Sequence, residues 1–267
     1  RVVVTLGGRH DWVDSEIENN LAGTTTDQDD SEFTGRAGVV YRSKFGVSPY
    51  VSYAESFLPE TGTDAQGDPF KPTTSQQWEG GIRYRPEVID ARFSLAAFNL
   101  VRQNVTTPAQ GNPNNTVQTG EVRSRGFEFE GNASLDRGIN LNVAYTFQDV
   151  EKTEDNAGFE GERPRQVPKH EASAWVDYTV QSGTLKGLGI GSGVRYKGPT
   201  FADNANTVKL DGFTLVDAAI SYEWRSLEVS VRGENLFDNK HVASCTSTNA
   251  CFFGPERRVF ANVAYRW

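Results

Sequence analysis

Apolar and polar residues alternate with a period of two along most of the chain, in segments long enough to be β-strands. In the segment 258–267, Val259, Val263 and Tyr265 share one face while Arg258 and Arg266 share the other. The same alternation recurs near 227–234, 214–224, 188–197, 170–179, 139–147, 127–130 and 78–85. Because successive side chains of a strand point to opposite faces, each segment has one face suited to hydrocarbon and one suited to water. The pattern predicts about twelve strands of about 10 to 15 residues.

Short and long connections alternate between these predicted strands. The short ones lie near 43–46, 86–88, 136–138, 182–187 and 225–226, and the long ones near 14–30, 59–72, 108–115, 153–168, 202–211 and 238–256. An up-and-down membrane barrel has tight periplasmic turns and long external loops, whereas a Greek-key sandwich has no reason to place every long loop at one end. We therefore predict an all-β chain of antiparallel, up-and-down transmembrane strands. A soluble β protein is the alternative, since its strands also alternate.

Composition and charge exclude some classes of protein. The 267 residues carry a net charge of −8 and no basic stripe, which argues against nucleic acid as a partner. Mean hydropathy is low, at −0.54. No apolar run approaches the roughly 18 residues of a membrane helix, so we exclude a helical membrane protein. The sequence begins at Arg1 and has no methionine or leader, and we interpret it as a mature chain or a fragment.

Cys245 and Cys251 are the only cysteines, with five residues between them. That spacing is too wide for a CxxC redox motif, and a metal site would need more ligands than the nearby His241 supplies. We predict a single disulfide formed in an oxidising compartment, outside the cytoplasm.

The last part of the chain combines several distinctive motifs. "NLFD" at 235–238, "VASC" at 242–245, "G-x-x-R" at 254–257 and the terminal aromatic strand together resemble the end of TonB-dependent outer-membrane receptors for ferric siderophores, in the ferrichrome and hydroxamate branch. The segments 50–84 and 124–135 resemble further parts of the same family. The likeness covers nearly the whole chain.

This resemblance implies a barrel of about 22 strands closed inside by an N-terminal plug, with a TonB-contacting box ahead of it. Residues 1–267 would be the C-terminal portion of that barrel, without plug or box. The implied function is capture of a ferric hydroxamate-type siderophore and its TonB-coupled import across the outer membrane of a Gram-negative bacterium. The implied partners are the siderophore, TonB through the missing part, outer-membrane lipid, lipopolysaccharide and the barrel assembly machinery.

The resemblance implies that aromatic side chains of the inner wall and the external loops hold the siderophore together with plug residues. Rings suit this role because they offer a large and rigid contact area to an organic chelate. The candidates here are aromatic residues of the long loops. They are Phe252, Phe253, Phe57, Phe70, Phe159 and Phe201. Packing within their own loops is the alternative. Val263, Tyr265 and Trp267 are assigned to recognition by the assembly machinery, although the family usually ends in Phe. A place for Trp267 in the aromatic girdle at the membrane interface is the alternative, and it is compatible with the first role. The resemblance also implies that the siderophore's own oxygens cage the iron, so we expect neither a protein metal ligand nor a cofactor.

Charged residues on the polar faces have a simpler explanation than catalysis. They are expected to solvate the inner wall and to pair across strands: Glu79, Arg83, Arg85, Glu128, Glu130, Asp177, Arg195, Asp217, Glu223, Arg232 and Glu234. His10, His170 and His241 have no catalytic motif around them. We therefore predict that the chain is not an enzyme. A passive pore of about twelve strands and a small barrel enzyme, of phospholipase or protease type, are the alternatives.

Overall fold

The computed structural model describes residues 1–20, 23–64, 67–109, 112–135, 137–247 and 249–267. Twelve strands form one antiparallel sheet in which sequence neighbours are also spatial neighbours, in the order β1-β2-β3-β4-β5-β6-β7-β8-β9-β12-β13-β16. Their bounds are β1 (Val2–Asn19), β2 (Thr24–Tyr41), β3 (Val47–Leu58), β4 (Thr73–Tyr84), β5 (Asp90–Ala109), β6 (Asn112–Leu135), β7 (Ile139–Glu154), β8 (His170–Thr179), β9 (Leu188–Lys197), β12 (Phe213–Trp224), β13 (Leu227–Glu234) and β16 (Arg258–Tyr265). The predicted up-and-down arrangement of about twelve strands is confirmed.

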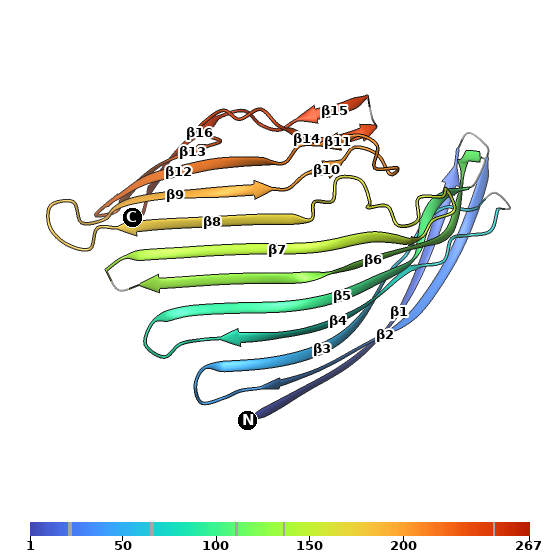
Figure 1. Cartoon of the computed structure of the whole chain (residues 1–267), viewed down its shortest axis with the longest axis horizontal. Coiled ribbons are helices and arrows are strands. Elements are labelled where there is room, and N and C mark those ends of the chain that lie inside the picture. The colour runs from blue at the N-terminus through green and yellow to red at the C-terminus, as the bar shows by residue number, and fades with distance from the viewer. Residues whose placement is uncertain (21–22, 65–66, 110–111, 136, 248) are drawn as a thin grey trace.

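Two small hairpins stand outside the main sheet. They are β10 (Thr200–Phe201) with β11 (Lys209–Leu210), and β14 (Val242–Ser247) with β15 (Ala250–Phe253). Both lie in long connections, at the end of the sheet opposite the two chain termini (Figure 1). We call this the long-loop end, and the other the short-turn end. Among the described residues, no helix is long and apolar enough to cross a membrane.

Cross-strand register carries the apolar face from one edge of the sheet to the other. Residues directly opposite each other share a face, and the pairs Val263↔Val229, Ile220↔Ile190 and Val39↔Val4 join apolar side chains across β16, β13, β12, β9, β2 and β1. These side chains are exposed although they are apolar, with Val4 60% and Val263 66% accessible. A single sheet with one exposed apolar face matches a wall between lipid and a polar interior.

Two segments expected to be long loops are instead strand hairpins. β1 continues to Asn19 and β2 begins at Thr24, with unbroken register from Val2↔Tyr41 to Asn19↔Thr24. Likewise β5 runs to Ala109 and β6 begins at Asn112. A membrane-spanning strand needs only about 9–11 residues. The ends of these long strands lie beyond that length, so a polar composition that resembled a loop is compatible with a paired backbone.

The sheet has two free edges among the described residues. β1 pairs only with β2 and β16 only with β13, and the sheet curves from one to the other without closing (Figure 1). The passive-pore alternative needs twelve strands that close on themselves, and this sheet does not.

Candidate ligand-binding site at the long-loop end

The last long connection carries a cross-linked hairpin, which we call the cysteine hairpin: β14, β15 and the turn between them. Cys245 and Cys251 lie opposite each other in the hairpin register and form a disulfide, as predicted. Cys245 is almost completely buried, at 1% exposure. The cross-link therefore fastens the outer strand of the hairpin to a residue that is packed against the rest of the protein.

Phe252 and Phe253 follow the second cysteine on β15 and are open to solvent. Phe252 is paired with Ser244 and is 57% exposed, while Phe253 is paired with Val242 and is 75% exposed. Consecutive strand residues face opposite ways, so the two rings point to opposite sides of the hairpin. The site thus offers two accessible rings held on a covalently closed backbone.

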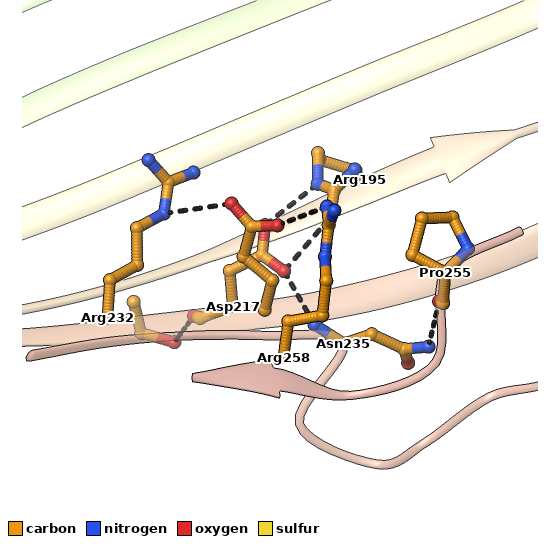
Figure 2. Close-up of polar contacts among 8 residues, drawn as sticks. Arg195, Asp217, Arg232, Asn235, Pro255 and Arg258 are labelled. Atoms are coloured by element: carbon orange, nitrogen blue, oxygen red, sulfur yellow. Dashed lines mark hydrogen bonds and ion pairs between the residues drawn. The ribbon is translucent and has the colours of Figure 1, made fainter. Parts of the chain in front are cut away.

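The "NLFD" segment fastens the base of this connection to the sheet. The backbone N–H of Asn235 donates to the buried carboxylate of Asp217 at 2.9 Å, and Arg195 donates to the same carboxylate through Nε at 2.7 Å (Figure 2). The Asn235 side chain donates to the carbonyls of Asn239 and Pro255, at 3.1 and 3.2 Å. One residue therefore ties both arms of the loop to β12.

Asp238 completes this clamp. Its carboxylate accepts the backbone N–H of Arg257 at 2.9 Å. Asn235 and Asp238 both have positive φ, of 51° and 54°, a conformation that Asn and Asp adopt more readily than most residues. In the sequence, "NLFD" and "G-x-x-R" indicate only a family resemblance, and this structural role was not predicted. The sequence signal for it was an Asn and an Asp shortly after a strand, at 235 and 238, because both residue types favour turns.

Some of the charges on the polar face pair across neighbouring strands, as expected; Arg195 of β9 with Asp217 of β12 is one such pair. Glu234 of β13 accepts from Arg258 of β16 at 2.7 Å, and Arg266 contacts Glu228 at 3.1 Å. Arg232 lies 3.4 Å from Glu234 on the same strand. Cross-strand pairs of this kind solvate and align the strands and require no reacting chemistry.

The β7–β8 and β9–β12 connections pack together beside the cysteine hairpin. Lys152 lies near the end of β7, past the roughly 9–11 residues that a strand needs to cross a membrane. It is 6% exposed and donates through Nζ to the Asn204 carbonyl at 3.1 Å. Burial lowers the pKa of its ammonium, opposed by the carboxylate of Asp155 nearby. Asn206 accepts the Arg163 backbone N–H at 3.2 Å and donates to the Arg163 carbonyl at 2.8 Å.

Two predicted ring contacts lie within this loop packing. The Lys152 ammonium is 5.0 Å from the centre of the Phe159 ring, and the Arg163 guanidinium is 5.6 Å from that of Phe201. These cation–π contacts use one face of each ring. A siderophore role for Phe159 and Phe201 stays a prediction, and it would have to use the faces that remain.

The other two predicted phenylalanines belong to the first half of the sheet. Phe70 is buried at 9% exposure, and its carbonyl accepts Nε2 of Gln28 at 2.8 Å. Phe57, at the end of β3, is half-buried and lines an open cleft with Arg9 and Asp11. The structure therefore does not bring the six phenylalanines into one cluster.

Each of the three histidines contacts an aromatic side chain. The His241 ring lies 4.1 Å from that of Phe213, centre to centre, His170 shares a hydrogen bond with the Tyr145 hydroxyl at 2.9 Å, and His10 stacks edge-on against Trp12. In the described ranges, no group of three or more His, Cys, Asp or Glu residues is placed to hold a metal ion.

Val263 and Tyr265 lie on the edge strand β16, and Trp267 follows it. All three are exposed, and the first two continue the apolar face through Val229 and Leu227. Their assignment to barrel assembly stays a prediction.

The comparisons with known proteins decide the family. Residues 1–236 match the model of the "TonB dependent receptor-like, beta-barrel" family. The chain belongs to the TonB-dependent receptors. The Escherichia coli (strain K12) "Ferrichrome outer membrane transporter/phage receptor" is 42% identical over all of the chain and 36% of its own length. The "Ferrioxamine B receptor" of Salmonella typhimurium (strain SL1344) is 34% identical over 98% of the chain and 38% of its own length.

Solved receptors share the fold at lower identity. The siderophore receptor PiuA from Acinetobacter baumannii superposes with a TM-score of 0.86 at 21% identity, covering 99% of this chain and 40% of PiuA. The chain thus spans well under half the length of these TonB-dependent receptors. Family membership confirms the predicted resemblance, the all-β fold class and the outer-membrane location in a Gram-negative bacterium. The family consists of receptors and transporters, in agreement with the prediction that the chain is not an enzyme.

Proposed function

We propose that this chain is the C-terminal barrel portion of an outer-membrane receptor that binds a ferric, hydroxamate-type siderophore at the cell surface and imports it with TonB-coupled energy. The observation that carries the proposal is the 42% identity to the ferrichrome transporter over all of the chain, including the cysteine hairpin. A relative named for ferrioxamine B also matches over nearly all of it. Ferrichrome and ferrioxamine B are the first ligands to test.

The remainder of the receptor supplies the parts that these 267 residues lack. The free edges of β1 and β16 support additional strands that complete the barrel, because an unpaired edge in a membrane leaves backbone groups unsatisfied. In this proposal, a plug domain inside the barrel and a TonB-contacting segment complete the transporter. The exposed apolar face contacts membrane lipid and lipopolysaccharide, and the edge strand β16 engages the assembly machinery.

Binding at the long-loop end rests on aromatic contact. The siderophore's oxygens already satisfy the ferric ion, so the protein needs to recognise only the organic shell. Phe252 and Phe253 provide solvent-accessible rings at low entropy cost, because each has only two side-chain torsions and the backbone beneath them is cross-linked. We propose them as the first contacts and rank Phe57, Phe70, Phe159 and Phe201 behind them, since those rings are buried, half-buried or packed against cations.

The test is equilibrium binding of ferrichrome and ferrioxamine B to the complete receptor in detergent or outer-membrane vesicles. Replacing both Phe252 and Phe253 with alanine should weaken binding by at least tenfold, the loss expected when ring contacts are removed. The matched control is Phe45→Ala, since Phe45 is 83% exposed in the turn after β2, at the short-turn end. If the unaltered receptor binds neither ferrichrome nor ferrioxamine B, the proposed ligand class is refuted.

A further inference from the structure

Gln166 connects three loops that are far apart in the sequence. It lies in the β7–β8 loop (155–169), and its backbone N–H donates to the Phe201 carbonyl of the β9–β12 loop (198–212) at 2.9 Å. Its side-chain amide Nε2 donates to the carbonyl of Cys245 in the cysteine hairpin. Its φ is 65°, a left-handed conformation that most residues avoid. In this conformation Gln166 bonds to both neighbouring loops at once, through its backbone N–H and through its side-chain amide.

The loop that carries Gln166 is itself firmly held. The backbone N–H of Lys152 donates to the Glu162 carbonyl at 3.0 Å, and that of Gly161 donates to the Lys152 carbonyl at 2.9 Å. Arg163 exchanges two hydrogen bonds with Asn206, as described above. These contacts fix Gln166 relative to β7 before any contribution from the hairpin.

The Cys245 carbonyl is a suitable point at which to hold the hairpin. Cys245 is nearly fully buried, so its polar groups have little access to water and depend on protein partners. The disulfide passes this restraint from Cys245 to Cys251, the residue directly before Phe252. Gln166 therefore lies at one end of a continuous path that leads to the two exposed rings.

We infer that Gln166 is a positioning residue: it holds the cysteine hairpin against the two neighbouring loops so that Phe252 and Phe253 are presented to the ligand in a fixed orientation. The inference rests on the proposed function for its ligand. Its physical basis is preorganisation, because a hairpin fixed before binding does not have to be ordered when the ligand arrives.

The restraint is measured by amide hydrogen exchange on the complete receptor without ligand. Gln166→Ala should raise the exchange rates of residues 242–245 and 250–253 about tenfold, because the hairpin opens more often when one anchor is lost. Gln166→Asn separates side-chain reach from backbone conformation, since Asn tolerates positive φ but is one methylene shorter. It should accelerate exchange like the alanine variant.

Gln118→Ala is the matched control. Gln118 also joins two segments by side-chain hydrogen bonds to backbone, accepting the Lys71 N–H at 2.6 Å and donating to the Lys71 carbonyl, but it lies on β6. Its loss should leave exchange in the cysteine hairpin unchanged. Unchanged hairpin exchange in Gln166→Ala, or an equal increase in Gln118→Ala, would overturn the inference.

A double-mutant cycle then separates positioning from general stability. Gln166→Ala should raise the Kd for ferrichrome or ferrioxamine B about tenfold. Added to the Phe252→Ala/Phe253→Ala variant, it should cause little further loss, because its effect acts through those rings. Additive losses, or faster exchange with unaltered affinity, would reject positioning. Failure of the unaltered receptor to bind either siderophore would reject the proposed ligand, while the exchange result still decides whether Gln166 holds the hairpin.

Discussion

The backbone N–H of Asn235 lies 2.9 Å from a carboxylate oxygen of Asp217, eighteen positions earlier in the chain, and both residues are 3% exposed. Asp217 belongs to the wall of the sheet, whereas Asn235 opens the connection that carries the cysteine hairpin. This contact, together with the bonds from the Asn235 amide to Asn239 and Pro255, joins the loop that carries the cysteine hairpin to the sheet.

Asn235→Ala should destabilise the receptor by about 2–3 kcal/mol. It removes three part-buried side-chain hydrogen bonds, two donated to the Asn239 and Pro255 carbonyls and one accepted from the Asn239 N–H, and it places alanine at positive φ. Asn235→Gly relieves the backbone conformation and should cost less. Urea-induced unfolding in detergent, followed by tryptophan fluorescence, measures both. Asn132→Ala is the control, since Asn132 is exposed and bonds only to the Asn142 side chain at 2.7 Å among the contacts described. Equal stability of the Asn235 and Asn132 variants would contradict the clamp.

Gly254→Ala should disturb the cysteine hairpin, because a Cβ at this position would lie 2.0 Å from Nε2 of His241. The His241 ring is packed against Phe213, so it has little freedom to move aside. We expect a loss of about 1–3 kcal/mol in the free energy of unfolding, typical of overpacking.

His241→Ala provides the matching rescue. It removes the ring that meets the new methyl group, so the double variant Gly254→Ala/His241→Ala should be less destabilised than the sum of the single variants. Simple additivity in the same unfolding assay would show that the contact with His241 is not the cause.

Acid should loosen the β9–β12 loop through Asp203. Hydrogen bonds from the backbone N–H groups of Val208 and Thr207 and from the Thr207 hydroxyl hold the pKa of this carboxyl below its ordinary value of 3.8. A carboxyl whose pKa is lower in the folded state contributes stability above its unfolded pKa and loses it as pH falls through the folded value.

Amide exchange of Thr207 and Val208, corrected for the intrinsic pH dependence of exchange, checks this. Protection of these two amides should fall below about pH 4, and Asp203→Asn should remove most of that pH dependence. A protection profile identical in the two proteins would exclude Asp203 as the titrating group. Asp211→Asn, in the same loop, serves as the control.

Loss of the disulfide should lower the affinity of the complete receptor for ferrichrome. Cys245→Ser/Cys251→Ser frees a short loop whose closure is worth about 2–3 kcal/mol in the chain-entropy account. Because the restraint from the buried Cys245 carbonyl reaches Phe252 through this cross-link, ferrichrome binding by the complete receptor should weaken severalfold. Unaltered affinity with correct assembly would show that the hairpin backbone alone holds the rings.

The sequence predicted the main sheet well, for a reason visible in individual pairs. Val229 and Val263 were assigned to apolar faces by alternation alone, and they are cross-strand partners. Alternation is a property of a single segment, so it can be recognised in the sequence without knowing which strands pair with that segment. The segments 14–30 and 108–115 were predicted as loops because most of their residues are polar or glycine. Only the backbone pairing shows that their described parts belong to strands, up to Asn19 and Ala109 and again from Thr24 and Asn112.

The candidate site was less predictable. The Cys245–Cys251 pair followed from cysteine count and spacing, but the burial of Phe70 and the contacts of Phe159 and Phe201 with Lys152 and Arg163 depend on how separate loops meet. The same is true of Gln166, whose partners are 35 and 79 residues away. No periodic signal marks such a residue.

Four features could be predicted from residue order: the strand alternation, the asymmetry of the connections, the disulfide and the resemblance to the receptor family. Each rests on residues that are near one another in the chain or on motifs that can be compared directly. The folded arrangement was needed to show that the sheet has two free edges in the part of the chain that the structure describes, that "NLFD" is a clamp on Asp217, and which rings are exposed to solvent. Those features depend on contacts between distant segments, and such contacts are set by the curvature of the whole sheet and the packing of its loops.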